Sequence, residues 1–304
     1  MDVVYSSKRR KIYFIFSSIL IIASLICIFV IKPKIGIDFA GGTLMEFKFN
    51  NATGQSQITD FSKGFDFITG IKIQKTGDNT YLIRTNSLGK EDLEKYKSNL
   101  ASRVGEFSEI RLDNVGPTVS NDATNKAIWA TIIASIGIIL YVAYTFRSIP
   151  KPASSWRFGV CAITALVHDL IISIGIYTLL GYLLGYEIDS LFVVAVLTIL
   201  GYSVNDTIVI FDRIRENLKT HPEYSFAQNV NTSLVQSLAR SLNTSLTVVI
   251  VLLALLFLGG ESMRPFIALM LTGVVIGTYS SIFVAPPLLI AWQNKIDKKI
   301  KLTK

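Results

Sequence analysis

Six long apolar stretches alternate with polar connections along this chain. They lie at about residues 12–31, 126–146, 158–182, 191–211, 237–258 and 266–293. Each approaches or exceeds the roughly 18–20 residues that a helix needs to cross the hydrocarbon core of a bilayer. The pattern therefore predicts a polytopic α-helical membrane protein with six transmembrane helices. Pro286 and Pro287 interrupt the last stretch and are expected to end or kink its helix.

A different pattern fills residues 32–125, between the first two spans. Residues 43–49 alternate between apolar Met45, Phe47 and Phe49 and charged neighbours, which is typical of a half-buried strand. Further elements are predicted as helices at 57–67 and 90–103 and as strands at 71–75, 81–85 and 107–112. The order β-α-β-β-α-β favours one external α+β domain of the ferredoxin-like type between helices 1 and 2.

The distribution of basic residues predicts the orientation. The chain is half hydrophobic, with a mean hydropathy of +0.47 and a net charge of +8. Lys and Arg gather before span 1, after spans 2 and 4 and in the tail, whereas the loops at 183–190 and 259–265 hold only Arg264. Because cytoplasmic loops carry the excess of Lys and Arg, both termini are expected in the cytoplasm and residues 32–125 outside.

These boundaries divide the chain into four parts. They are 1–31 (cytoplasmic N-terminus and helix 1), 32–125 (external domain), 126–293 (helices 2–6) and 294–304 (basic cytoplasmic tail). A signal peptide is the competing interpretation of span 1. Its apolar core would be 7–15 residues long and followed by a small-residue cleavage site, so we expect an uncleaved anchor.

The composition argues against several kinds of chemistry. Cys27 and Cys161 both lie inside apolar stretches, and the two histidines are far apart, so neither a disulfide framework nor a metal site is expected. No nucleotide-binding loop or Ser/His/Asp triad is present, and no basic patch is interleaved with aromatic residues as in nucleic-acid binding. We therefore expect no cofactor, no nucleic-acid partner and no enzyme activity.

Ionisable residues inside three spans are the candidate functional residues. They are His168 and Asp169 in span 3, Asp206 beside Asn205 in span 4, and Arg240 in span 5. A charged group at the centre of a membrane helix costs roughly 2.5–3.5 kcal/mol on insertion scales. Other polar residues lie at helical spacing from these two, namely Thr198 and Tyr202 before Asp206 in span 4 and Asn243, Thr244 and Thr247 after Arg240 in span 5. Such stripes are expected to face the bundle interior or a water-filled cleft.

Two interpretations of Asp206 stay open. Asp206 takes up and releases a proton as it alternates between a dry setting and contact with Arg240, or the two residues form a fixed ion pair that joins two helices. His168 and Asp169 are adjacent, so they are expected to point about 100° apart and not to face one partner together. His168 is a proton relay or a packing residue.

Three further motifs carry weaker expectations. Asp212 opens a charged cluster at the end of span 4, where a solvated helix end is the plain interpretation. Asp38, with Gly41 and Gly42, either latches the junction to the external domain or forms a simple turn. The spacing Gly273-x3-Gly277-x3-Ser281 predicts close helix packing in span 6.

Several of these stretches together resemble the bacterial SecF family of protein translocase subunits. The matching segments are GIDFAGG at 36–42, ALVHD at 165–169, LTILGYSVNDTIVIFDRIREN at 197–217, ARSLNTSLT at 239–247 and GTYSSIFVAP at 277–286. The resemblance implies half of a resistance-nodulation-division-type assembly with SecD, associated with the SecYEG channel. It implies use of the proton-motive force to move preproteins, Asp206 and Arg240 as proton-transfer residues, and Asp38, His168, Asp169 and Asp212 as motif residues.

The chain departs from the family pattern in two places. Ser120-Asn121-Asp122 stands where the family tends to have a glycine and a Glu-Leu pair, and the loop at 147–156 looks like a local insertion. Two alternative functions stay open. One is a passive scaffold that docks SecD and other Sec accessory membrane proteins. The other is a small-molecule exporter of the same superfamily, although such exporters carry larger external regions and usually two six-span halves.

Overall fold

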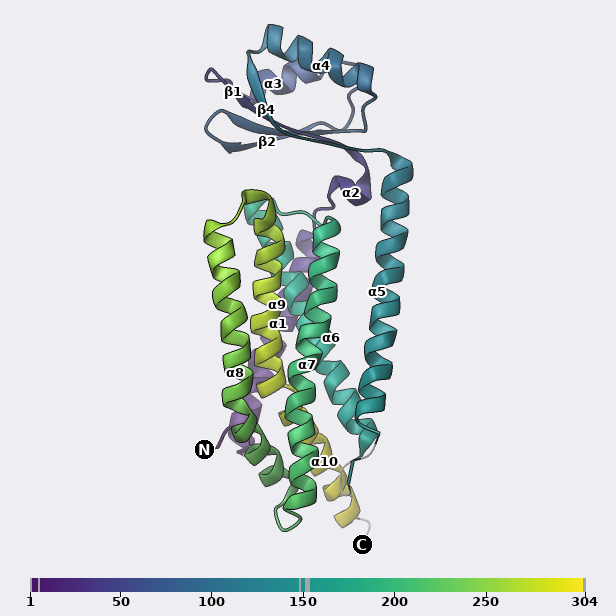
Figure 1. The fold of residues 1–304 in the computed structure, drawn as a ribbon, viewed down its shortest axis with the longest axis vertical. Coiled ribbons are helices and arrows are strands. Elements are labelled where there is room, and N and C mark those ends of the chain that lie inside the picture. Colours follow the sequence, from purple (N-terminus) through teal and green to yellow (C-terminus); the bar gives the residue numbers. More distant parts are fainter. Residues whose placement is uncertain (1, 5, 148, 151–153, 303–304) are drawn as a thin grey trace. The chain divides into compact units, whose positions relative to one another are not determined.

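A computed structural model of the chain describes residues 2–4, 6–147, 149–150 and 154–302. Within these ranges, six helices are long and apolar enough to cross a membrane, as the hydropathy pattern predicts. They are α1 (Ser7–Ile26) with the π-helical turn η1 (Cys27–Ile31), α5 (Pro117–Thr145), α6 (Ser155–Leu184), α7 (Ser190–Thr220), α8 (Phe226–Leu258) and the pair α9 (Arg264–Phe283) and α10 (Ala285–Leu302). Figure 1 shows them as one bundle.

The helix ends differ from the ends of the apolar stretches. α5 begins at Pro117, well before the predicted start at 126, and Ser120-Asn121-Asp122 lies in its first turns. α8 begins at Phe226 instead of 237, because Ser225 and Gln228 form a capping box at its start. Apolar residues mark only the part of a helix inside the membrane, and polar turns extend it. The prediction that the last span ends or kinks near Pro286 is confirmed by the break between α9 and α10.

The bundle has central and peripheral helices. The most apolar windows of α6 and α7 are 56% and 50% buried, against 11% for α1 and 6% for α5. Phe146 in the turn after α5, Phe158 of α6 and Phe211 of α7 pack together, with ring centroids 5.1–5.8 Å apart. Since α6 and α7 are enclosed by other helices, a polar group on them can be removed from lipid.

The small-residue motif of span 6 packs against α7, as predicted. A Cβ atom at Gly273 would lie 2.3 Å from the Ile199 side chain, and one at Gly277 would lie 3.1 Å from Cβ of Ser203. One turn further, Ser281 Oγ and Thr207 Oγ1 are hydrogen-bonded at 2.8 Å. Each member of the motif therefore meets one residue of an i, i+4, i+8 row on α7, which brings the two backbones close together.

The sheet between the first two spans has four antiparallel strands in the order β2-β3-β1-β4. Its elements are α2 (Ile37–Ala40), β1 (Gly42–Phe49), α3 (Gln55–Ser62), β2 (Lys72–Gly77), β3 (Thr80–Thr85), α4 (Lys90–Arg103) and β4 (Phe107–Val115). α3 and α4 lie on the same face of the sheet (Figure 1). The predicted element order is confirmed, but α3 ends at Ser62 instead of 67, and β4 continues three residues beyond 112.

The core of this domain lies between the sheet and the two helices. Met45, Phe47 and Phe49 are buried there, as the alternation along β1 predicts. Tyr96 of α4 is also fully buried, and its hydroxyl and Ser62 Oγ are 2.8 Å apart. Burial raises the pKa of Tyr96 to about 12, although the hydrogen bond with Ser62 acts in the opposite direction. The fold thus holds this phenol in its neutral form.

The domain that contains this sheet is expected to lose stability as the pH rises from 10 to 12. The phenol ionises near pH 10 in the unfolded chain, whereas in the folded chain the pKa of Tyr96 is about 12. The contribution of the neutral phenol to the free energy of unfolding is therefore complete below pH 10 and is lost progressively as the pH rises from 10 to 12. A shift of this size corresponds to about 3 kcal/mol. Pulse proteolysis of the full chain in urea should show this loss, and Tyr96→Phe should reduce it. Tyr224→Phe, at an exposed position, is the control; equal sensitivity of both variants would contradict the assignment.

The described chain separates into two compact units. One contains Ile35–Trp129 together with Ile188–Ser190, and the other contains the remaining described residues. Residues 188–190 directly precede or begin α7, so the start of this transmembrane helix belongs to the same unit as the sheet. The predicted insertion at 147–156 lies partly outside the described residues, which omit 148 and 151–153.

Candidate functional site in the helical bundle

Asp206 lies in the membrane part of α7 and faces α8. Its side chain is 8% exposed, and its Oδ2 atom accepts a hydrogen bond of 2.5 Å from Ser241 Oγ. An ionised carboxylate in an apolar bundle usually has several donors or a cation, because isolated buried charge is costly. A single hydroxyl can equally accept from, or donate to, a carboxyl group that gains and loses a proton. The setting of Asp206 is therefore compatible with both protonation states.

Arg240 does not pair with Asp206 in this structure. Arg240 is exposed, and among the described residues no ion pair joins its guanidinium to the Asp206 carboxylate. Consecutive residues of a helix point about 100° apart, so the turn of α8 that directs Ser241 towards α7 directs Arg240 elsewhere. The interpretation of a fixed ion pair is thus wrong for this arrangement of the helices.

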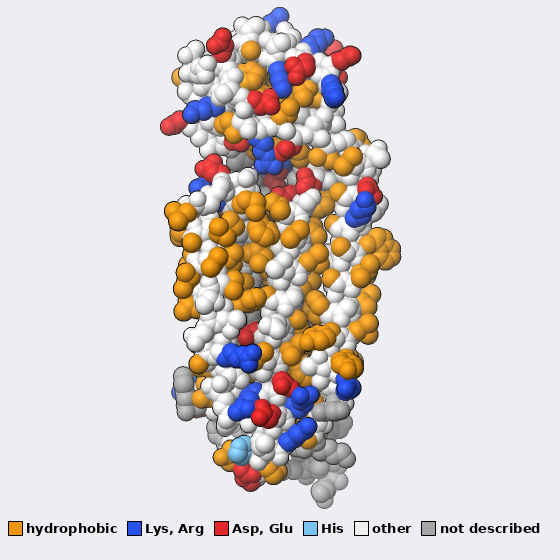
Figure 2. All heavy atoms as spheres, viewed as in Figure 1, with side chains coloured by type: hydrophobic (Ala, Val, Ile, Leu, Met, Phe, Trp, Pro, Cys, Tyr) orange, Lys and Arg blue, Asp and Glu red, His pale blue; other side chains and the backbone are white. Residues whose placement is uncertain are grey.

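A strip of polar residues is exposed on α7 and α8, the helices that the Asp206–Ser241 bond joins. This α7–α8 polar strip consists of Thr198, Gly201 and Asn205 on α7 and Arg240, Asn243, Thr244 and Thr247 on α8. Figure 2 shows the hydrophobic band of the bundle interrupted by such uncharged polar surface along α7. Within this chain most members of the two stripes are exposed, whereas Asp206 is buried and Tyr202 donates to Ser245; the expected water-filled cleft stays a prediction. A polar surface at membrane depth is costly against lipid.

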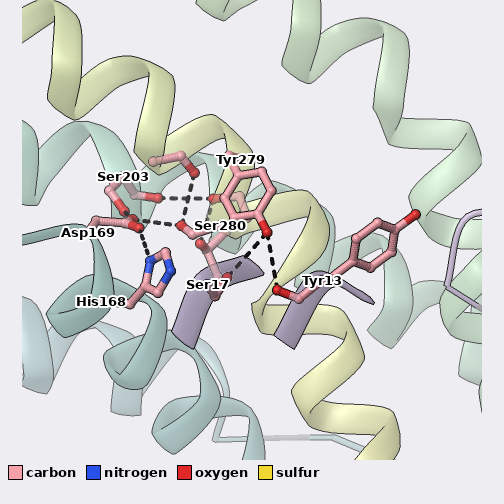
Figure 3. Close-up of polar contacts among 10 residues, drawn as sticks. Tyr13, Ser17, His168, Asp169, Ser203, Tyr279 and Ser280 are labelled. Atoms are coloured by element: carbon pink, nitrogen blue, oxygen red, sulfur yellow. Dashed lines mark hydrogen bonds and ion pairs between the residues drawn. The ribbon is translucent and has the colours of Figure 1, made fainter. Parts of the chain in front are cut away.

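Asp169 of α6 lies at the centre of a second, fully enclosed cluster (Figure 3). Its carboxylate is 0% exposed. Oδ2 accepts hydrogen bonds from Ser203 of α7 at 2.5 Å and Ser280 of α9 at 2.7 Å, and Oδ1 lies 2.8 Å from Nδ1 of His168. The carboxylate thus joins α6, α7 and α9 through serine hydroxyls, which do not stand out in the sequence as ionisable residues do.

His168 and Asp169 contact each other, an arrangement that their expected divergence around the helix did not suggest. Their Cβ atoms do diverge around α6, but the imidazole ring is long enough to turn back to the neighbouring carboxylate, which makes the two residues each other's partners. The His168 ring lies against Tyr279, with ring centroids 6.4 Å apart and an interplanar angle of 25°. Tyr279 hydroxyl in turn lies 3.2 Å from Ser17 Oγ and 3.3 Å from the Tyr13 carbonyl oxygen, both on α1.

The charged cluster after Asp206 is part of α7, which continues to Thr220. Asp212 pairs with Arg215 at 2.5 Å, and Arg213 pairs with Glu216 at 2.6 Å, all on one helix at i, i+3 spacing. These side chains are at least one third exposed, so the pairs stabilise the helix by no more than about 1 kcal/mol. The geometry is that of a solvated helix end.

Asp38 contacts the first residue of α7. Its Oδ2 atom accepts a hydrogen bond of 2.9 Å from the backbone N–H of Ser190, and Gly36 N–H donates to the Ile188 carbonyl at 2.8 Å. The first N–H groups of a helix have no partner within it, and a carboxylate there also interacts favourably with the helix dipole. Of the two interpretations of Asp38, the geometry corresponds to a latch. We call these two hydrogen bonds the α7 latch.

Gly41 and Gly42 permit the turn between α2 and β1. Their φ angles are +71° and +132°, which other residues adopt only with strain. A Cβ atom at Gly42 would also lie 2.6 Å from the Thr85 carbonyl oxygen of the adjacent strand. Both glycines are therefore required to bring β1 into the sheet directly after the residue that contacts α7.

Comparisons with known proteins agree with this architecture. Residues 95–295 match the family model "Protein export membrane protein SecD/SecF, C-terminal". Protein translocase subunit SecF of Thermobaculum terrenum is 39% identical over 95% of this chain and 93% of its own length. Protein translocase subunit SecDF of Bacillus subtilis is 35% identical over 96% of this chain, which corresponds to 38% of the longer relative.

Solved structures give the same result for the fold. The crystal structure of SecDF from Thermus thermophilus, described as a translocon-associated membrane protein, covers 94% of this chain with a TM-score of 0.80 and 32% identity. A second SecDF structure, in a super-membrane-facing form, covers the whole chain with a TM-score of 0.68 and 30% identity. This chain corresponds to 38% and 40% of those longer proteins.

Proposed function

The chain belongs to the SecD/SecF family of protein export membrane proteins, and we propose that it uses the proton-motive force, together with SecD, to promote preprotein export. It is a multi-pass protein of the bacterial inner membrane with a role in the Sec translocase. The observation that carries the proton-driven part is Asp206, a buried carboxyl group with one hydroxyl partner next to a polar surface. Gradient-dependent export in membrane vesicles, with Asp206→Asn as the variant, tests this proposal.

Asp206 is the group that binds and releases the proton. When it is neutral, the Ser241 contact suffices; when it is charged, Arg240 is the nearest cation along α8, one residue from Ser241. A small rotation of α8 would exchange one partner for the other. One charge crossing 100 mV yields about 2.3 kcal/mol, enough to bias two arrangements of the helices by roughly fiftyfold. Asn205, next to Asp206 on the exposed side of α7, lines the route to that carboxyl.

SecD is the partner that covers the α7–α8 polar strip. SecD and SecF segments occur in one chain in SecDF relatives, so the two halves lie together in those proteins. Contact with a second polar surface would remove the cost of exposing Arg240 and its neighbours to lipid. SecYEG and the translocating preprotein are the further partners in this proposal, and other Sec accessory membrane proteins are candidates. Both termini lie in the cytoplasm, and residues 32–125 lie outside, as the basic residues predict.

The α7 latch couples proton binding to the external domain. Asp206 and Ser190 belong to one continuous helix, and Ser190 is held by Asp38, four residues before β1 begins. A shift of α7 along its axis would therefore displace the segment around Asp38 that leads into β1. Asp169, which the sequence suggests as a relay residue together with His168, accepts a hydrogen bond from Ser203 of α7.

Asp38→Ala is expected to weaken the coupling without unfolding the protein. Removing an acceptor from a helix N-terminus costs typically about 1 kcal/mol, which frees the start of α7. We expect faster amide exchange at residues 188–193 and export reduced several-fold under a gradient. Asp38→Asn, which keeps an acceptor oxygen, should restore most export. Asp78→Ala, at an exposed turn, is the control; equal export by Asp38→Ala and Asp78→Ala would contradict the latch.

The scaffold alternative makes the opposite prediction for Asp206. A scaffold needs the α7–α8 polar strip for docking but no titrating group, so Asp206→Asn would export normally while truncation of the bundle would abolish export. The two proposals are thus separated by one variant that leaves the surface of the strip unchanged.

A further inference from the structure

His168 has one ring nitrogen with no partner. The side chain is 4% exposed and lies in the middle of α6. Nδ1 faces the Asp169 carboxylate, whereas no described atom lies within hydrogen-bonding distance of Nε2. A buried polar atom without a partner costs free energy, typically 1–3 kcal/mol. The unpartnered atom indicates a task for Nε2.

The contacts of Asp169 define the tautomer of this histidine. Its Oδ2 accepts from the hydroxyls of Ser203 and Ser280, and its Oδ1 lies 2.8 Å from Nδ1. Two hydroxyls already donate to this carboxyl group, so in its ionised form the third hydrogen bond must come from Nδ1–H. In the neutral ring the proton on Nδ1 leaves Nε2 with a free lone pair. Nε2 is therefore a hydrogen-bond acceptor with no donor among the described residues.

The charge of the pair is not balanced by its neighbours. The groups that face it are hydroxyls: Ser203 from α7, Ser280 and Tyr279 from α9, and Ser17 from α1 beyond Tyr279. Asp206 turns towards α8, and Arg157 lies at the start of α6, where it bonds Gln293 of α10. A carboxylate beside a neutral imidazole thus leaves a net negative charge inside the bundle, which is costly.

We infer that His168 binds a proton at Nε2 and forms, with Asp169, a second protonation site of the chain. A proton delivered by water forms a bond to the Nε2 lone pair; Nδ1–H remains, no protein bond breaks, and the pair changes from one net negative charge to neutral. Imidazole is the side chain best suited to change charge near neutral pH. Asp169 is a positioning residue that fixes the ring and balances its charge. This inference rests on the proposed proton-driven function only for its coupling to export.

Protonation of His168 is expected to affect the contacts of α9 and α1. The ring lies beside that of Tyr279, with ring centroids 6.4 Å apart, so the charge of the imidazole changes next to this phenol. Tyr279 hydroxyl bonds α1 at Ser17 and Tyr13, and α1 leads to the segment that holds Asp38. The second site therefore acts on helices other than α8, the helix that Asp206 contacts.

Nitrogen NMR of the full chain, labelled with ¹⁵N-histidine in lipid nanodiscs, tests the site directly. The chain has two histidines, and the other, His221, is partly exposed beside Glu223. His221→Gln therefore leaves one labelled residue. As the pH falls from 8.5 to 5, we expect Nε2 to change from unprotonated to protonated while Nδ1 stays protonated. One unchanged protonation state across this range, or a neutral ring with its proton on Nε2, would overturn the inference.

Export measurements separate a proton-binding role from a packing role. Asparagine at position 168 keeps an N–H donor near the place of Nδ1 but cannot bind the proton. We expect His168→Asn to fold and to lose the pH-dependent step of gradient-driven export that His221→Gln retains. The same pH profile in both variants would mean a packing role only. If His168→Asn and His221→Gln share one pH profile but Asp206→Asn loses export, the proposed function stands and the role of His168 does not. If Asp206→Asn exports normally, the proposed function is refuted whatever the result for His168.

Discussion

Asp206→Asn is expected to abolish the gradient-dependent part of preprotein export while the protein stays folded and assembled with SecD. Asparagine has the shape of aspartate, and its amide oxygen can still accept the hydrogen bond from Ser241. It cannot ionise, so the voltage no longer acts on a charge at this position. The bias of roughly fiftyfold that 100 mV gives to the two arrangements of the helices would be lost. The measurement is the rate at which vesicles complete transport of a preprotein.

Asp212→Asn is the matched control on the same helix. It makes the same chemical change about two turns away, where the carboxylate is half exposed and pairs with Arg215. Such a pair contributes about 0–1 kcal/mol, so export should stay near that of the original chain. If both variants lose export, charge at the end of α7 matters more than the buried carboxyl. If neither does, Asp206 is not the coupling residue.

Gly277→Leu is expected to prevent assembly of the bundle. Cα and Cβ of Ser203 lie 3.3 and 3.1 Å from the place of a Cβ atom at Gly277, so a leucine side chain must push α7 and α9 apart. Overpacking costs about 1–3 kcal/mol and occasionally more. The displacement would also break the bonds from Ser203 to Asp169 and from Thr207 to Ser281. Thermal unfolding in detergent and the amount of protein in membranes measure the effect.

Gly137→Leu is the control for this change. Apart from the neighbouring backbone of α5 itself, no described atom lies within 4 Å of a Cβ at Gly137, on the exposed side of α5, so the same substitution meets open space. Its melting temperature should equal or exceed that of the original chain, since leucine is the better helix former. Equal loss of stability in the two variants would show that glycine at 277 is not needed for close approach to α7.

Much of the fold could be predicted from the sequence because its signals are periodic. Apolar runs mark the membrane helices, and the alternation around Phe47 marks a strand. The starts of α5 and α8 were misjudged since polar turns beyond the membrane have no such signal. The attachment of residues 188–190 to the segment before β1 depends on backbone hydrogen bonds, such as the one between Gly36 and Ile188, and no sequence pattern predicts these.

Only the ionisable residues of the site could be predicted from the sequence. Asp206, Asp169 and His168 are conspicuous in apolar spans, but their partners are hydroxyls. Ser241 and Ser280 resemble the many small residues that serve only in helix packing, so their contacts with the carboxylates carry no signal in the sequence. The outward position of Arg240 could not be derived either, because it depends on which face of α8 meets α7.

Collapse of the proton gradient during a single export reaction tests the central claim most directly. Vesicles that contain SecD and either the original chain or Asp206→Asn would begin transport of one preprotein under an imposed gradient, and an uncoupler would then be added. The account predicts that transport by the original chain slows at once to the rate of Asp206→Asn, whose own rate does not change. If transport by Asp206→Asn begins as fast as that of the original chain and slows equally, Asp206 does not couple the gradient to export.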